Sequence, residues 1–199
     1  MLKHSKLIIL FLFTSIILFA CNNSGSGKRE NKEVVKEENK TTTVADTSKK
    51  SIPTETRKWV GNTDIKINYH SPGVRGRIIW GGLVPYDNVW VTGAHKATTL
   101  EIGKDFMVGE KKIPTGKYAL FTIPGKAEWT VIINKNHNQH LADDYDAKDD
   151  VARIKVKPEI LKENQERLKY EIDQTGERMA NIIISWEKLS VKFGLMIKD

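Results

Sequence analysis

From Trp59 onward, apolar and polar residues alternate with a period of two in a series of short runs. In the segment from Ile65 to Tyr69, the side chains of Ile65, Ile67 and Tyr69 fall on one face. Such alternation is typical of a strand with one buried face, because successive side chains point to opposite sides. Further runs of this character occupy 98–102, 106–108, 117–123, 129–133, 151–156, 168–172, 180–186 and 189–193. Nine short strands without a repeated β-α-β pattern predict an all-β fold, an antiparallel β-sandwich of about nine strands.

The breaks between these runs carry turn residues. Pro124-Gly125-Lys126 predicts a tight connection before the next strand. Glu187-Lys188 leaves only two residues between two runs and so predicts a hairpin, although it lacks the Asn-Gly or Asp-Gly preferred there. One short helix is predicted over 158–167, where proline stands at the start and Leu161 and Leu168 share a helical face.

The N-terminal segment, Met1 to Ala20, has the form of a secretory signal peptide. Lys3 and Lys6 precede an apolar run from Leu7 to Ala20. These fourteen residues would rise only about 21 Å as a helix, less than the roughly 30 Å hydrocarbon core of a bilayer. A basic start, a short apolar run and a small final residue predict a secretory signal.

Cys21, the only cysteine, follows this run directly. The stretch Leu18-Phe19-Ala20-Cys21 resembles the lipobox of bacterial lipoproteins, although the position of Phe19 usually holds a small residue. The resemblance implies cleavage before Cys21 and lipidation of its thiol and new amino terminus. The alternative is an uncleaved anchor with an unmodified thiol. With one cysteine, neither an internal disulfide nor a metal site of several thiolates can form.

The segment from Asn22 to Lys58 contains no aromatic residue and few aliphatic ones. Such a composition cannot bury enough apolar surface to offset its ordering entropy, so residues 21–58 are expected to be a lipidated cysteine and a disordered tether. The folded domain is then expected over 59–199. Asn22 is not the aspartate associated with inner-membrane retention, and no acidic cluster follows it. The expected location is therefore the cell envelope, lipid-anchored to the outer membrane and facing the periplasm.

The formal net charge of +7 is not a property of the predicted domain. The tether has nine Lys and Arg against six Asp and Glu, and the part from Trp59 onward has 21 against 19. A net charge of +2 over the domain gives no basic surface of the kind that binds nucleic acid, so no nucleic-acid partner is expected.

The stretch from Val84 to Thr99 holds the first candidate site. Tyr86, Trp90 and His95 would line a ligand groove, with Arg75 and Arg77 placed to clamp an anionic group. The same residues also have an architectural explanation as a turn and strand, and aromatic side chains belong to a core more often than to a ligand site. The two arginines could equally pair with carboxylates of the domain.

The second candidate is the polar stretch from His137 to Asp150. His137, His140, Asp143 and Asp144 could supply metal ligands. The stretch lacks the glycine turn of calcium loops and the spacing of zinc motifs, so a solvated loop is the favoured interpretation and neither metal nor cofactor is expected. His70-Ser71 lacks the Gly-x-Ser-x-Gly pattern of a serine hydrolase.

Several motifs together resemble the family called domain of unknown function 2911. They are YHSPGVRGRIIWGGLVPYDNVWVTGAHKATTLEI, IPTGKYALFTIPG, WTVIINK, YDAKDDVARIKVKP and IIISWEKLSVKF, spread from about Ile65 to Phe193. Members of that family are typically exported proteins of Gram-negative bacteria, with no established activity, cofactor or catalytic residues. Similar sequences commonly carry arginine at the position of Val91, Asn or Asp at that of His95 and Glu at that of Lys96. A catalytic or metal site would not tolerate such exchange, so this departure argues against a functional role for His95.

The expected function is therefore that of a membrane-anchored envelope lipoprotein with a binding or assembly module for an envelope protein, a peptide or a glycan. The alternative is an envelope hydrolase, with or without a metal, that uses His70, His95, His137 or His140 with neighbouring aspartates. A third alternative is a structural role at the outer membrane without a small ligand.

Overall fold

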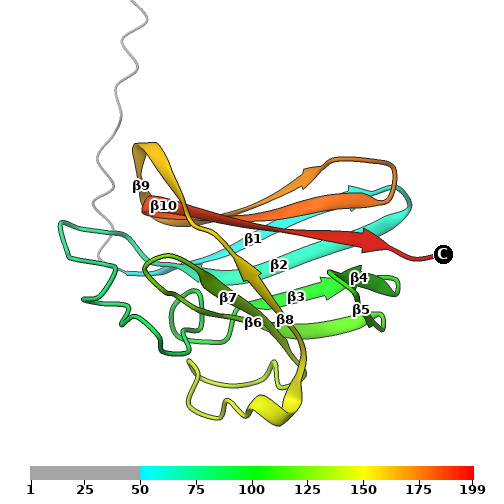
Figure 1. Ribbon diagram of the computed structural model, residues 1–199, viewed down its shortest axis with the longest axis horizontal. Coiled ribbons are helices and arrows are strands. Elements are labelled where there is room, and N and C mark those ends of the chain that lie inside the picture. The colour runs from blue at the N-terminus through cyan, green and yellow to red at the C-terminus, as the bar shows by residue number, and fades with distance from the viewer. Residues whose placement is uncertain (1–49) are drawn as a thin grey trace, which may run out of the picture. The chain divides into compact units, whose positions relative to one another are not determined.

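The computed structural model describes residues 50–199 (Figure 1). The predicted signal peptide, the predicted lipidation site at Cys21 and the tether up to residue 49 lie outside the described residues. Residues 50–199 contain no helix with the length and hydrophobicity of a membrane span.

The described chain forms two antiparallel β-sheets, which confirms the predicted all-β sandwich (Figure 1). The large sheet has the strand order β1-β2-β3-β6-β7-β8, and the small sheet has the order β5-β4-β10-β9. The strands span Ile52–Val60 (β1), Thr63–Ser71 (β2), Thr99–Ile102 (β3), Phe106–Val108 (β4), Lys111–Ile113 (β5), Gly116–Ile123 (β6), Trp129–Asn134 (β7), Asp150–Val156 (β8), Glu159–Gln174 (β9) and Met179–Ile197 (β10). A single 3-10 turn, η1, covers Ala147–Asp149 within the described residues.

The main core lies between the two sheets. Ile65, Ile67 and Leu100 are fully buried on the inner face of the large sheet, and Tyr170 and Ile182 are buried on the small sheet. Each such side chain contributes about 1.5–3 kcal/mol relative to an exposed position. The period-two pattern of β2, seen in the sequence, is the pattern of this burial.

A second, smaller core covers part of the outer face of the large sheet. Ala119, Phe121 and Ile132 point away from the main core and are covered by Val91 and Ala97 from the loop before β3. Tyr145, from the loop between β7 and β8, packs edge-on against Phe121 with ring centroids 5.4 Å apart. The outer face is therefore partly apolar and closed, and only its other part is available to polar ligands.

β10 corrects the predicted hairpin at Glu187-Lys188, because the chain continues through both residues as one strand. The pairing of β10 with β9 shifts register on both sides of Glu187, whose φ is 55°. The inward-facing positions change there from even numbers, ending at Trp186, to odd numbers, beginning at Val191. The extra residues lie on β9, where the four steps from Lys169 to Gln165 face two steps of β10 and the five steps from Gln165 to Ile160 face the next two. This bulge-like irregularity coincides with the change of parity in β10, which makes one strand look like two in the sequence.

The helix predicted over 158–167 is also wrong. Glu159 begins β9, which pairs with β10 as far as Gln174. The residues from Glu159 to Glu166 are mostly exposed, with Ile160 82 % exposed, because β9 is an edge strand with few core contacts in this half. The predicted tether likewise extends too far, since Ile52–Val60 pairs with β2 along its whole length as β1.

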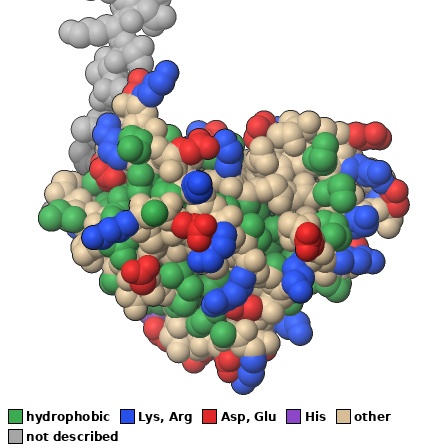
Figure 2. All heavy atoms as spheres, in the orientation of Figure 1, with side chains coloured by type: hydrophobic (Ala, Val, Ile, Leu, Met, Phe, Trp, Pro, Cys, Tyr) green, Lys and Arg blue, Asp and Glu red, His purple; other side chains and the backbone are tan. Residues whose placement is uncertain are grey.

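Charged side chains of both signs are interspersed on the face of the molecule in Figure 2. Ion pairs within the described residues include Arg57 with Asp64 at 2.8 Å and Lys66 with Glu101 at 3.3 Å. The face drawn in Figure 2 shows no large patch of one sign.

Candidate functional site

The loop from Trp90 to Thr98 is fixed by a buried polar network. Trp90 exchanges two backbone hydrogen bonds with Thr122 of β6, at 2.8 and 3.0 Å. The carbonyl oxygen of Thr92 accepts hydrogen bonds from the Thr98 hydroxyl at 3.0 Å and the Tyr170 hydroxyl at 2.8 Å. A side chain of the small sheet thus ties this loop to the core. Burial raises the pKa of Tyr170 well above its ordinary value, so its hydroxyl stays a donor.

Gly93 lies where this loop passes closest to its neighbours. A Cβ atom there would stand 2.7 Å from the Thr98 hydroxyl oxygen and 3.3 Å from the carbonyl oxygen of His70. Glycine is therefore needed at position 93 because a side chain would not fit there. A left-handed backbone is not the reason, since the residues of this loop with positive φ are Thr92 and His95.

Four tryptophans gather beside this loop. The rings of Trp90 and Trp186 are stacked, with centroids 5.7 Å apart, and Trp80 meets both edge-on. Trp80 also contacts Trp129, with ring centroids 4.8 Å apart. The indole N–H groups of Trp80, Trp129 and Trp186 are buried and have no acceptor among residues 50–199. Aromatic contacts therefore supply the packing here, while the donors remain unsatisfied.

The first cavity, here called the tryptophan pocket, has a volume of about 590 Å³. Trp90 and Trp186 line it together with apolar side chains, and the polar lining includes Arg75, Arg77 and Asp143. The apolar lining residues share small or branched side chains and come from two loops, between β2 and β3 and between β7 and β8: Leu83, Val84, Val89, Val91, Ala94, Leu141 and Ala142. A mostly apolar pocket of this size with a few charged groups is the usual form of a small-ligand site.

The two arginines of the tryptophan pocket differ in whether their guanidinium groups are already hydrogen-bonded. Arg77 donates hydrogen bonds to the carbonyl oxygens of Gly73 at 2.6 Å and Val74 at 3.2 Å. Arg75 is held through its backbone, whose N–H donates to a carboxylate oxygen of Glu166 at 2.9 Å, and has a φ of 51°. Its guanidinium has no ion pair within the described part of the chain and is exposed, so it can meet an anion at this pocket.

The structure divides the groove predicted from the sequence. Arg75, Arg77 and Trp90 line one pocket, but Tyr86 and His95 do not. Tyr86 packs against Gly81, where a Cβ atom would stand 2.8 Å from its ring, and Lys126 lies 5.9 Å from its ring centroid. Trp186 completes the stack, but the sequence predicts only that it lies in a strand. Its neighbours in the sequence do not show that its strand packs against the loop of Trp90.

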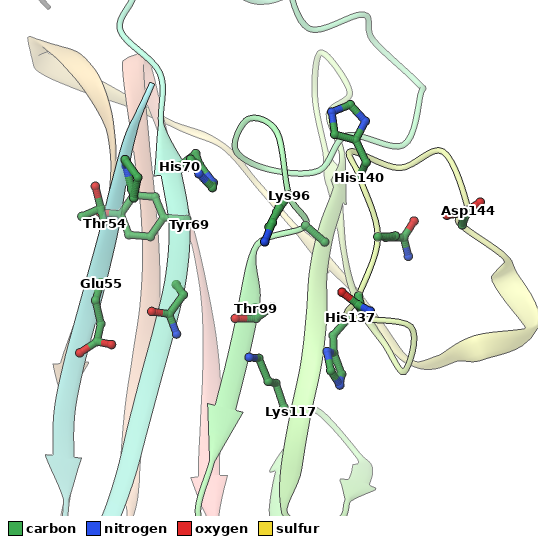
Figure 3. Close-up of a pocket in the computed structure, with 15 residues that line it drawn as sticks. Thr54, Glu55, Tyr69, His70, Lys96, Thr99, Lys117, His137, His140 and Asp144 are labelled. Atoms are coloured by element: carbon green, nitrogen blue, oxygen red, sulfur yellow. The ribbon is translucent and has the colours of Figure 1, made fainter. Parts of the chain in front are cut away.

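A second cavity, here called the polar trough, has a volume of about 810 Å³ (Figure 3). It lies over the uncovered part of the large sheet, between β1 and the loop that follows β7. Strand residues that line it include Glu55, Asn68, Thr99 and Lys117, and loop residues include Lys96. The sequence does not predict any of these five as a site residue, because each is typical of a polar position on a strand surface or in a loop.

The histidines of the hydrolase alternative lie in and beside this trough. His70, His137 and His140 line it, and His95 meets the ring of His70 edge-on at 5.2 Å. Partial burial lowers the pKa of His70, and electrostatic interactions with His95 and Lys96 lower it further.

The candidate metal ligands are not gathered into one site. His140 Nδ1 lies 3.0 Å from a carboxylate oxygen of Asp143, while His137 and Asp144 contribute separately to the trough lining. Among residues 50–199, no group of three or more His, Cys, Asp or Glu side chains could hold a metal ion.

Comparison with curated proteins gave no match, and comparison with solved structures gave none either. A family model described as a protein of unknown function, DUF2911, matches residues 51–195. That range runs from the residue before β1 to near the end of β10, and includes both cavities. The chain therefore belongs to the DUF2911 family.

Proposed function

We propose that the chain is a membrane-anchored envelope lipoprotein whose β-sandwich captures the apolar carboxyl-terminal end of a peptide or envelope protein. The observation that carries this proposal is the stack of Trp90 and Trp186 in a pocket that also holds Arg75 and Arg77. The N-terminal signal, Cys21 and the tether supply the anchor, and the outer membrane facing the periplasm is the proposed location.

The lining of the tryptophan pocket supports a ligand with two chemically different parts. An apolar side chain would pack against the indole rings and the branched residues, where burial contributes about 25 cal/mol per Å². A carboxylate would meet Arg75, whose guanidinium matches the geometry of two carboxylate oxygens. A peptide carbonyl entering beside Trp186 would offer an acceptor for its unsatisfied indole N–H.

Tryptophan fluorescence of the full chain tests this ligand class. The probe is acetyl-Leu-Phe with a free carboxylate, and its control is the same peptide with a carboxamide. We expect saturable quenching or a spectral shift with the carboxylate only, because the peptides differ in the charge that Arg75 would bind. Equal responses to both peptides, or no response to either, would refute the proposal.

A variant series assigns the response to this pocket. Arg75→Gln should weaken binding by roughly tenfold or more, since a charge-assisted hydrogen bond contributes about 1.5–3 kcal/mol. Lys162→Gln removes a positive charge from an exposed position of β9 outside the pocket and should leave binding unchanged. If Arg75→Gln and the unaltered chain bind the peptide with equal affinity, Arg75 does not contact the ligand.

The anchor is tested separately. Cys21→Ser should release the protein from the membrane fraction of the producing cells, and mass spectrometry of the unaltered protein should find acyl chains on Cys21. An unmodified thiol on a full-length chain would refute the anchor while leaving the peptide experiment valid.

A further inference from the structure

The floor of the polar trough is a row of polar side chains across adjacent strands of the large sheet. Glu55 of β1 stands opposite Asn68 of β2, and Asn68 stands opposite Thr99 of β3. Directly opposed residues of an antiparallel pair have Cβ atoms about 4.5–5.5 Å apart, so these groups form a continuous surface. Lys117 of β6 follows at the next level of the same face (Figure 3).

The middle of this surface is positively charged. Lys117 pairs in register with Glu101, but that carboxylate binds Lys66 at 3.3 Å. Neither Lys117 nor Lys96 has an ion pair within residues 50–199. In Figure 3 the two lysines lie on either side of Thr99, whereas Glu55 and Asp144 lie at opposite ends of the trough. A ligand that carries a negative group at its centre fits this distribution.

Two buried polar atoms of the trough lining have no partner. The Thr99 hydroxyl oxygen and the side-chain carbonyl oxygen of Gln139 both lack a hydrogen bond within the described residues, and each residue is 7 % exposed. The amide nitrogen of Gln139 donates to the carbonyl oxygen of Asn136 at 2.7 Å, so its carbonyl oxygen remains as an acceptor. Buried polar groups without partners are unfavourable, and a ligand with hydroxyl donors would satisfy an acceptor of this kind.

We propose that the polar trough is a second binding site, independent of the tryptophan pocket, which takes an acidic saccharide that bears hexuronate carboxylates. The lysines bind the carboxylate, and sugar hydroxyls satisfy Thr99, Gln139 and the carboxylates at the two ends. An inorganic anion would satisfy the lysines but would present few donors to Gln139. The volume of about 810 Å³ lies in the range of small-ligand sites and admits a disaccharide.

Calorimetric titration of the full chain in detergent tests this site. The probe is digalacturonic acid, and its control is digalactose, in which each carboxylate is replaced by a hydroxymethyl group. We expect saturable binding of the acidic sugar and binding of the neutral sugar that is weaker by about tenfold or more. An absence of binding by the acidic sugar, or equal binding of both, overturns the proposal.

Matched variants locate the binding. Lys96→Gln and Lys117→Gln should each weaken binding by about tenfold, whereas Lys111→Gln, an exposed lysine of the small sheet, should leave it unchanged. Thr99→Val keeps the branched shape and removes the hydroxyl, so it should weaken binding without altering the circular dichroism spectrum. Unchanged affinity in both trough lysine variants overturns the assignment.

A further control separates this site from the peptide proposal. Arg75→Gln should leave the affinity for digalacturonic acid unchanged, because Arg75 lines only the tryptophan pocket. Tighter binding of an acidic tripeptide than of the acidic sugar, lost in Lys117→Gln, would identify the trough as a peptide site and overturn the saccharide proposal.

Discussion

Trp90 and Trp186 stack with their ring planes inclined by 18°, although one belongs to a loop and the other to the last strand. Trp90 is fixed by its backbone pairing with Thr122, and Trp186 directly precedes the bulge at Glu187. The stack therefore joins the loop of the tryptophan pocket to the irregular point of β10. β-Bulges commonly redirect a side chain next to a binding site, and this one accompanies Trp186 in the pocket lining.

Glu187, which lies between the two register shifts, allows a direct test. Glu187→Gly should raise the free energy of unfolding by about 0.5–1 kcal/mol, because glycine adopts a φ of 55° without the steric cost paid by glutamate. The measurement is urea unfolding followed by circular dichroism. Lys188→Gly is the matched control, since Lys188 has no positive φ and glycine should destabilise the strand there. Destabilisation by both substitutions alike would contradict this account of the bulge.

Gly93 is predicted to be intolerant of a methyl group. Gly93→Ala should lower the free energy of unfolding by about 1–3 kcal/mol, because the new Cβ atom would overlap the Thr98 hydroxyl oxygen at 2.7 Å. The penalty should be smaller in a Thr98→Ala background, where that oxygen is absent. Gly103→Ala, whose nearest neighbour would be 3.7 Å away, serves as the control and should have little effect. An equal cost in both backgrounds would exclude the proposed overlap.

The Tyr170 hydroxyl is predicted to stabilise the loop from within the core. Tyr170→Phe should cost about 0.5–1.5 kcal/mol, since the carbonyl oxygen of Thr92 keeps its hydrogen bond from Thr98. The raised pKa of Tyr170 also means that ionisation favours the unfolded chain, so stability should fall as the pH rises through about 10, the ordinary value. Urea unfolding between pH 8 and pH 11 should show a smaller loss in Tyr170→Phe. If both proteins lose the same free energy of unfolding over this pH range, the alkaline destabilisation comes from other groups.

His70 is predicted to make the domain sensitive to acid. Its pKa is lowered in the folded state, so the unfolded chain binds a proton more readily. The contribution of His70 to stability is complete above its ordinary pKa of about 6.5 and is lost as the pH falls through the lowered value. Urea unfolding at pH 7.5 and pH 5 should therefore show a larger acid-induced loss in the unaltered chain than in His70→Gln. A larger loss in the variant would reverse the sign and refute the prediction.

Strand patterns were predictable where one face is buried and the other is solvated. Ile65, Ile67 and Tyr69 alternate visibly because the inner face of β2 meets the small sheet. The pattern failed in the first half of β9, where an exposed edge strand carries residues that also favour helices. There the backbone pairing with β10 decides the conformation, and a pairing between distant segments leaves no local mark.

The residues of the candidate sites were likewise predictable only in part. Arg75, Arg77 and Trp90 could be singled out from residue type alone, and the fold places all three at one pocket. Trp186 and the trough residues Thr99 and Lys117 could not, because an ordinary strand residue becomes a site residue only through its neighbours across the sheet.

By itself the sequence determined the all-β class, most strand positions and the family, since alternation and turn residues are local properties of the chain. Only the tertiary structure decided the continuous course of β10, the start of the domain at β1 and the grouping of polar residues into two separate cavities. These features depend on register and packing between segments far apart in the sequence, where backbone hydrogen bonds and buried contacts outweigh local preference.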